Sequence, residues 1–91
     1  MLQNTRLGVW RKGNERVTQY IDLDMQEAYV RVSLLALISM RVIGADETPE
    51  TIHGAHKLTM QQLETFQAAM HAQGWELEEA DGSEGPNETM P

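Results

Sequence analysis

The chain has 91 residues, of which 41% are hydrophobic and 23% charged, which is enough for one small globular domain and too apolar for a disordered chain. It has no cysteine, which excludes disulfides and thiolate metal sites, and its start lacks the apolar run of a secretory signal, so we expect a cytoplasmic protein. The net charge of −7 disfavours nucleic acid as a partner, because an acidic surface repels phosphate.

The first predicted element is a β-hairpin over residues 5–23, in which apolar and polar residues alternate on both sides of a Gly-Asn pair. A three-residue loop, 12–14, is preferred to a loop of the Gly-Asn pair alone. The shorter loop would place Arg11 opposite Arg16, and the two guanidinium groups would repel each other.

The preferred register gives the hairpin one apolar face and one basic, aromatic face. Tyrosine, tryptophan and arginine dominate the hot spots of protein interfaces, so the second face is the candidate partner-binding surface. An equally simple alternative is that Trp10 and Tyr20 only cover the core. The predicted partner-binding residues are Arg6, Trp10, Arg11, Arg16 and Tyr20.

The next predicted element is a long apolar helix over residues 25–43, ended by Gly44. Its few polar residues do not gather on one side, so the helix lacks a solvent face. A chain this short cannot easily surround such a helix, and we therefore expect a homo-oligomer, with a dimer favoured. The predicted self-association residues are Leu34, Leu35, Leu37, Ile38 and Val42.

Two further helix starts follow. Thr48 and the proline after it predict a short helix. Thr59 and Gln62 form a stronger signal, a capping box, at the start of an amphipathic helix over 60–73 that Gly74 would end.

The last elements are a short strand and a tail. Trp75 and Leu77 alternate with glutamates, which indicates a strand or extended segment. Residues 80–91 have almost nothing to bury, so a disordered acidic tail is expected after a single domain over 1–79. The sequence therefore predicts an α+β fold, with an N-terminal hairpin packed on a long apolar helix, a short helix and a C-terminal amphipathic helix.

Candidate chemistry is sparse. His53, His56 and His71 are of a residue type that binds metals, but no cysteine accompanies them and Gly54 interrupts helical spacing, so surface or capping roles are preferred. No nucleophile elbow or glycine-rich phosphate loop is present. The sequence predicts no catalytic residue, no metal and no cofactor, and hence a protein that is not an enzyme.

The segment RVTQYIDLDMQEAY, a strand followed by the predicted helix, resembles the ribbon-helix-helix repressors. That resemblance implies a DNA-binding transcriptional regulator with Arg16, Thr18 and Tyr20 facing the major groove. The chain departs from that family in its preceding hairpin strand, its long connector and its overall acidity. The preferred hypothesis is therefore a small acidic regulatory or inhibitory protein that binds another protein, and DNA binding is the alternative.

Overall fold

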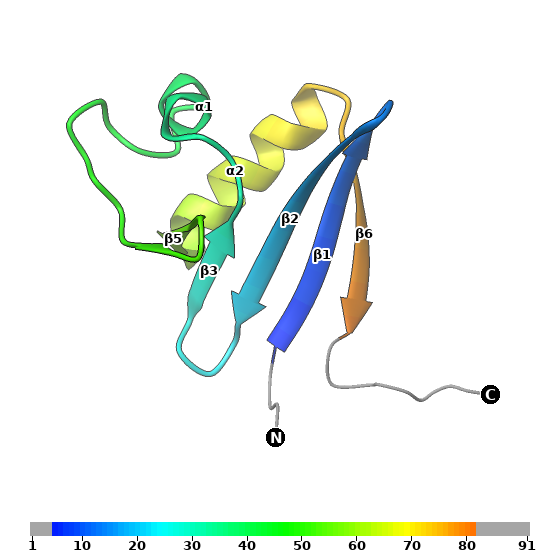
Figure 1. The fold of residues 1–91 in the computed structure, drawn as a ribbon, viewed down its shortest axis with the longest axis horizontal. Coiled ribbons are helices and arrows are strands. Elements are labelled where there is room, and N and C mark those ends of the chain that lie inside the picture. Colours follow the sequence, from blue (N-terminus) through cyan, green and yellow to red (C-terminus); the bar gives the residue numbers. More distant parts are fainter. Residues whose placement is uncertain (1–4, 82–91) are drawn as a thin grey trace.

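The computed structural model describes residues 5–81. Within this range the chain forms one six-stranded antiparallel sheet, in the spatial order β4-β5-β3-β2-β1-β6, with α2 behind the sheet and α1 beyond the end of β3 (Figure 1). The strands are β1 (Thr5–Lys12), β2 (Glu15–Asp22), β3 (Glu27–Val30), β4 (Thr51–Ile52), β5 (Ala55–Thr59) and β6 (Glu76–Asp81). The helices are α1 (Leu34–Ser39) and α2 (Met60–Ala72).

The predicted fold class is wrong, because the chain is mostly sheet and the long helix over 25–43 does not exist. Its first part is β3, in which Ala28 and Val30 are fully buried and the residues between and beside them face the other way. Tyrosine and valine also favour strands. The hydroxyl of Ser33 then accepts a hydrogen bond from the Ala36 amide at 3.1 Å, so that a helix begins only there.

α1 ends before Gly44, in a Schellman motif, in which the residue after the helix cap takes a left-handed conformation. The Val42 amide donates to the Leu37 carbonyl at 2.9 Å. Arg41, with φ of 63°, donates to the Ile38 carbonyl at 3.0 Å. Because an L-residue is strained in this region, the end of α1 carries a local cost that a glycine would not.

The short helix predicted at Thr48 is also wrong, because the following residues form the β4-β5 hairpin. Its turn consists of His53 and Gly54, with φ of 51° and 82°. Positive φ at both central positions is typical of a type I′ turn, whose twist matches that of two paired strands. Pairing of Ile52 with Ala55 across this turn outweighs the local helix-start signal.

The later elements agree with the sequence. The capping box of α2 is present, since Thr59 Oγ1 accepts from the Gln62 amide at 3.1 Å and Gln62 Oε1 accepts from the Thr59 amide at 2.9 Å. The predicted segment around Leu77 is β6, which pairs with β1 and runs to Asp81, so that residues 80 and 81 belong to a strand and not to the predicted tail. The rest of the predicted acidic tail, 82–91, lies outside the described residues.

The register predicted for the first hairpin is wrong by one residue. The loop is Gly13-Asn14 alone, and Arg11 does lie opposite Arg16. Their repulsion is offset because β6 adds on the far side of β1, where Glu78 Oε1 accepts from Arg11 Nε at 2.9 Å. A shift of one residue moves every side chain to the other face of the sheet, which turns Trp10 inward.

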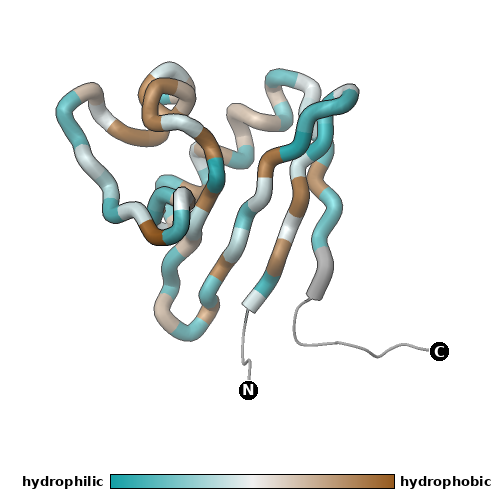
Figure 2. Tube along the Cα trace, in the orientation of Figure 1, coloured by the Kyte–Doolittle hydropathy of each residue, from teal (hydrophilic) through white to brown (hydrophobic). Residues whose placement is uncertain are grey.

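Trp10 is the centre of the core beneath the sheet. It is fully buried, and its Nε1 donates to Gln19 Oε1 on β2 at 2.8 Å. This bond gives a partner both to the indole N–H and to the side-chain carbonyl of the buried Gln19. Phe66 and His71 of α2 meet the indole edge to face, at ring centroid distances of 6.1 and 4.9 Å. The alternation of polar and apolar residues along β1 and β2 is visible in Figure 2. α2 therefore covers the inner face around Trp10, and the outer face of the sheet is left open.

Replacing Arg41 by glycine should raise the free energy of unfolding by about 0.5–1 kcal/mol, because relief of left-handed strain exceeds the added entropy of the unfolded chain. Gly74, which has φ of 92° after α2, provides the matched control, and its replacement by alanine should lower stability by about 1 kcal/mol. Urea denaturation measures both changes. A lower midpoint for Arg41→Gly would contradict the Schellman assignment.

Candidate binding site on the open face of the sheet

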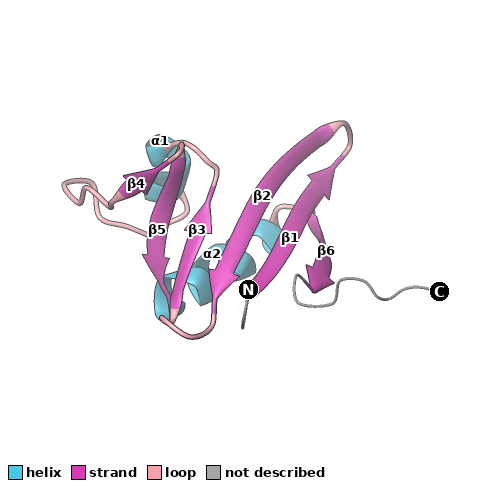
Figure 3. Cartoon of the chain, turned by 60° about the horizontal axis from the view of Figure 1, so that its bottom comes forward, coloured by secondary structure: helices cyan, strands magenta, loops and turns pink. Residues whose placement is uncertain are grey.

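α2 covers one face of the sheet and the other face is open, as Figure 3 shows from a second direction. Side chains of alternate residues on β2, β3 and β5 point to this open face. A sheet face that only contacts water carries mainly small polar and charged side chains. On this open face, aromatic and basic side chains gather at the centre. The outward residues used below are Arg16, Thr18, Tyr20, Tyr29 and Arg31.

An apolar hollow of about 280 Å³ lies at the centre of the open face. Tyr20 and Tyr29 are opposite each other in the β2-β3 register, and their rings lie 6.3 Å apart at an angle of 48°. The β4-β5 hairpin closes the opposite side with Ile52 and Ala55. The polar lining is restricted to hydroxyl groups and one guanidinium, that of Arg31.

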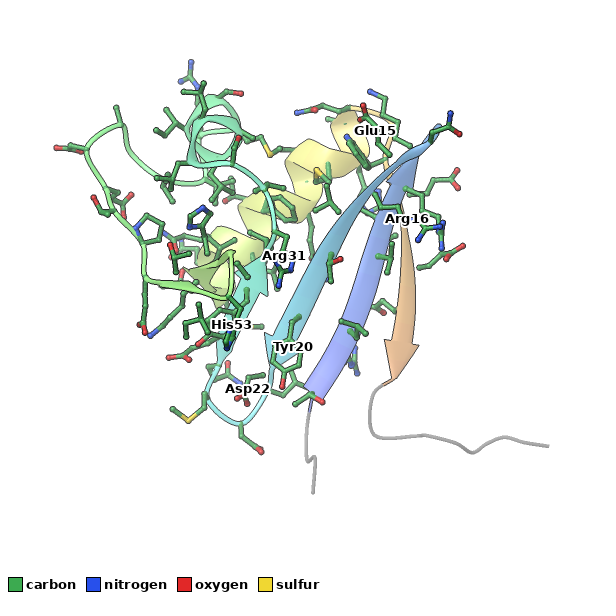
Figure 4. All side chains as sticks on the ribbon, in the orientation of Figure 1. Glu15, Arg16, Tyr20, Asp22, Arg31 and His53 are labelled. Atoms are coloured by element: carbon green, nitrogen blue, oxygen red, sulfur yellow. The ribbon has the colours of Figure 1, made fainter. Side chains whose placement is uncertain are left out.

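Arg31 is the distinctive group of this hollow. Its Nη1 would lie 2.8 Å from a Cβ at Gly54, so the guanidinium packs directly on the turn glycine. Figure 4 shows Arg31 and Tyr20 on the open face, with His53 at the tip of the adjacent hairpin. Among the described residues Arg31 forms no ion pair or side-chain hydrogen bond, whereas Arg11 and Lys57 on the same face pair with glutamates.

Glu27 holds the lower wall of the hollow in place. The Tyr29 hydroxyl donates to Glu27 Oε1 at 3.2 Å, and Lys57 Nζ lies 3.1 Å from the other oxygen. Partial burial, and then the hydrogen bond and charge of Glu27, raise the pKa of the Tyr29 phenol. Hydrogen bonds to Glu27 and Glu50 raise the pKa of Lys57. Tyr29 therefore stays a neutral, oriented hydroxyl over the physiological pH range.

A second hollow, of about 480 Å³, adjoins the first and shares Arg31 with it. It lies between the start of β2 and the segment that leads into α1. Val17, Met70 and Trp75 line its apolar interior, and Arg16 also borders it. The side chain of Arg31 therefore borders both hollows.

The structure divides the predicted partner-binding residues. Arg16 and Tyr20 lie on the open face beside the hollows, and Arg11 lies on that face in its ion pair with Glu78. Arg6 is exposed but shares the opposite face with Trp10. Trp10 is not available to a partner, because it is fully buried under α2.

Sequence reasoning missed Tyr29 and Arg31, because both were assigned to the helix over 25–43. The signal that could have found them is the alternation from residue 28 to residue 31, in which small or branched residues alternate with tyrosine and arginine. Set beside the same alternation at Arg16, Thr18 and Tyr20, it would have placed these side chains on one sheet face.

The five predicted self-association residues do not share one helix face, because the long helix over 25–43 does not exist. Leu37 and Val42 are buried in the core of the single chain, and Leu34 and Ile38 pack against it. Leu35, which is 74% exposed, is the member left on the surface.

The three histidines lie on different elements. His53 is in the β4-β5 turn, His56 Nδ1 lies 2.8 Å from Thr51 Oγ1, and His71 contacts the edge of Trp10. Within residues 5–81 no group of three or more His, Cys, Asp or Glu side chains could hold a metal ion. Over the same range, no helix has the length and apolar character needed to cross a membrane.

The ribbon-helix-helix resemblance has no structural counterpart. In that family a strand pairs with its copy in a second chain, whereas β2 already lies between β1 and β3. Comparison of the chain with protein-family models, curated proteins and solved structures finds no match. Function is therefore inferred from the site itself.

Replacing Glu27 by glutamine should lower the pKa of the Tyr29 phenol, because the accepting carboxylate and its charge are removed. The matched change Glu50→Gln should lower it less, since Glu50 acts on Tyr29 only through a weaker charge effect. A titration of the tyrosine ring signals by NMR measures both values. An unchanged Tyr29 pKa in Glu27→Gln would show that this hydrogen bond does not form in solution.

Proposed function

We propose that this chain is a non-enzymatic regulatory or inhibitory protein that binds another protein through the open face around Tyr20, Tyr29 and Arg31. The observation that supports this function is the Arg31 guanidinium, unpaired among the described residues, beside two tyrosine rings in an apolar hollow. Tyrosine and arginine are enriched among the residues that contribute most binding energy at protein interfaces. A cytoplasmic location, which the lack of cysteine permits, is part of the proposal.

A protein partner is favoured over nucleic acid on electrostatic grounds. Aromatic rings on an open sheet can also stack on unpaired bases, but such sites combine stacking with a basic groove along the backbone. Here the chain carries −7 overall, and Arg11 and Lys57 on the open face are already paired with glutamates. Two remaining guanidinium groups, of Arg16 and Arg31, suit local contact with a protein better than a phosphate track.

A non-enzymatic role is favoured by the lining of the hollow. The described residues that line it include no carboxylate or imidazole, and no side-chain hydrogen bond joins the hydroxyl of Thr18 to a general base. A homodimer has less support than a different partner, because Leu37 and Val42 are already buried within one chain.

The double substitution Tyr20→Ala with Arg31→Ala should reduce partner capture about 30-fold, the equivalent of a 2 kcal/mol hot spot. The measurement is affinity capture from an extract of cells that make the protein, quantified by mass spectrometry against wild type. Leu35→Ala, at an exposed apolar residue of α1, is the matched control and should capture the partner normally. Circular dichroism should remain native for both variants.

Capture at the wild-type level by the double variant would exclude the open face as the interface. Loss of all capture after nuclease treatment would indicate a nucleic acid instead. A concentration-dependent dimer in sedimentation experiments, abolished by the double substitution, would indicate a second copy of the chain.

A further inference from the structure

β2 extends beyond its neighbour β3. The last backbone hydrogen bond between them is donated by the Arg31 amide to the Thr18 carbonyl, at 3.0 Å. The chain then turns away at Ser33 into α1, as the separation of α1 from the upper part of β2 shows in Figure 1. Residues 15–17 therefore pair with β1 on one side, and the described residues place no strand on the other side.

The direction of the backbone groups at this point follows from the pairing. In an antiparallel sheet, successive residues direct their N–H and C=O alternately to one neighbouring strand and the other. Thr18 uses its carbonyl toward β3, so Arg16, two residues earlier, directs its amide and carbonyl to the same side. Neither group has a partner among the backbone hydrogen bonds of the described residues. Arg16 is thus paired with β1 on one side, and its backbone groups on the other side have no backbone partner among the described residues.

The second hollow lies next to this unpaired position. Arg16 and Arg31 border it, and Met40, Met70 and Trp75 line its apolar interior. Glu15 contributes the one carboxylate of the lining, against two guanidinium groups. The local charge is therefore opposite in sign to that of the whole chain, which favours an acidic occupant.

We propose that the partner contributes an extended acidic segment that adds as a short strand to β2 at Arg16. This inference rests on the proposed function and specifies the chemistry of the partner. The partner residue opposite Arg16 would share the open face with it, where a carboxylate would meet Arg16 and Arg31. The residues on either side would point into the hollow toward Met40 and Trp75. The recognised segment therefore alternates acidic and apolar residues.

Arg16→Pro tests the backbone contact. Proline removes the one amide that would donate to the added strand, while the bonds between β1 and β2 remain, because Arg16 directs none of its own toward β1. Arg16→Ala is the matched control, since it loses the same guanidinium but keeps the amide. The probe is a phage-displayed library of random linear peptides, selected on the wild-type protein.

We expect the selected peptides to alternate acidic and apolar residues, and to bind Arg16→Pro about 10-fold more weakly than Arg16→Ala, as the loss of one backbone hydrogen bond implies. Hydrogen exchange of the wild-type protein is a second readout that needs no substitution. The Arg16 amide should exchange rapidly in the free protein and slowly with a selected peptide. The Val17 amide, which faces β1, should be slow in both states.

Equal binding to the two Arg16 variants, or no change in Arg16 exchange, would overturn strand addition. So would a library that enriches no peptide above bare support, or one that enriches basic peptides. If strand addition fails in this way while Tyr20→Ala with Arg31→Ala still abolishes capture of the cellular partner, the open face remains the interface and only the mode of binding is wrong.

Discussion

The register of the first hairpin determines which side chains of this protein enter the core and which lie on the open face of the sheet. With Gly13-Asn14 as the loop, Trp10 faces α2 and Tyr20 faces outward. Burial of an indole stabilises a fold by about 3–5 kcal/mol, whereas repulsion between two exposed arginines costs less than about 1 kcal/mol. The buried tryptophan therefore decides the register, and the Arg11 ion pair with Glu78 reduces the remaining cost.

The open face depends in turn on the short β4-β5 hairpin. Its type I′ turn places a glycine where the Arg31 guanidinium needs space, since a Cβ at Gly54 would approach Nη1 to 2.8 Å. The same hairpin supplies Ile52 and Ala55 to the hollow. One two-residue turn thus shapes the hollow and positions its cation.

Local signals in the sequence were sufficient for α2 and β6, because a capping box and an alternating segment involve residues close together in the chain. The register of the first hairpin was not predictable in this way. Glu78, which offsets the repulsion between Arg11 and Arg16, is 67 residues from Arg11 in the sequence. A comparison of β1 with β2 alone does not include it. The error over 25–43 had another cause, since a nearly continuous apolar run hides the alternation that separates strand from helix. For the same reason, the sequence did not predict that Tyr29 and Arg31 belong to the candidate site.

The two outer strands of the sheet, β4 and β6, carry features that oppose aggregation. β4 is only two residues long, and β6 carries Glu76, Glu78 and Glu79. Short or charged outer strands discourage the sheet-to-sheet joining that leads to fibres. At the outer edges, therefore, chance pairing with other chains is opposed by length or by charge. The position at Arg16 involves only residues 15–17, so that few backbone groups are offered to another chain there.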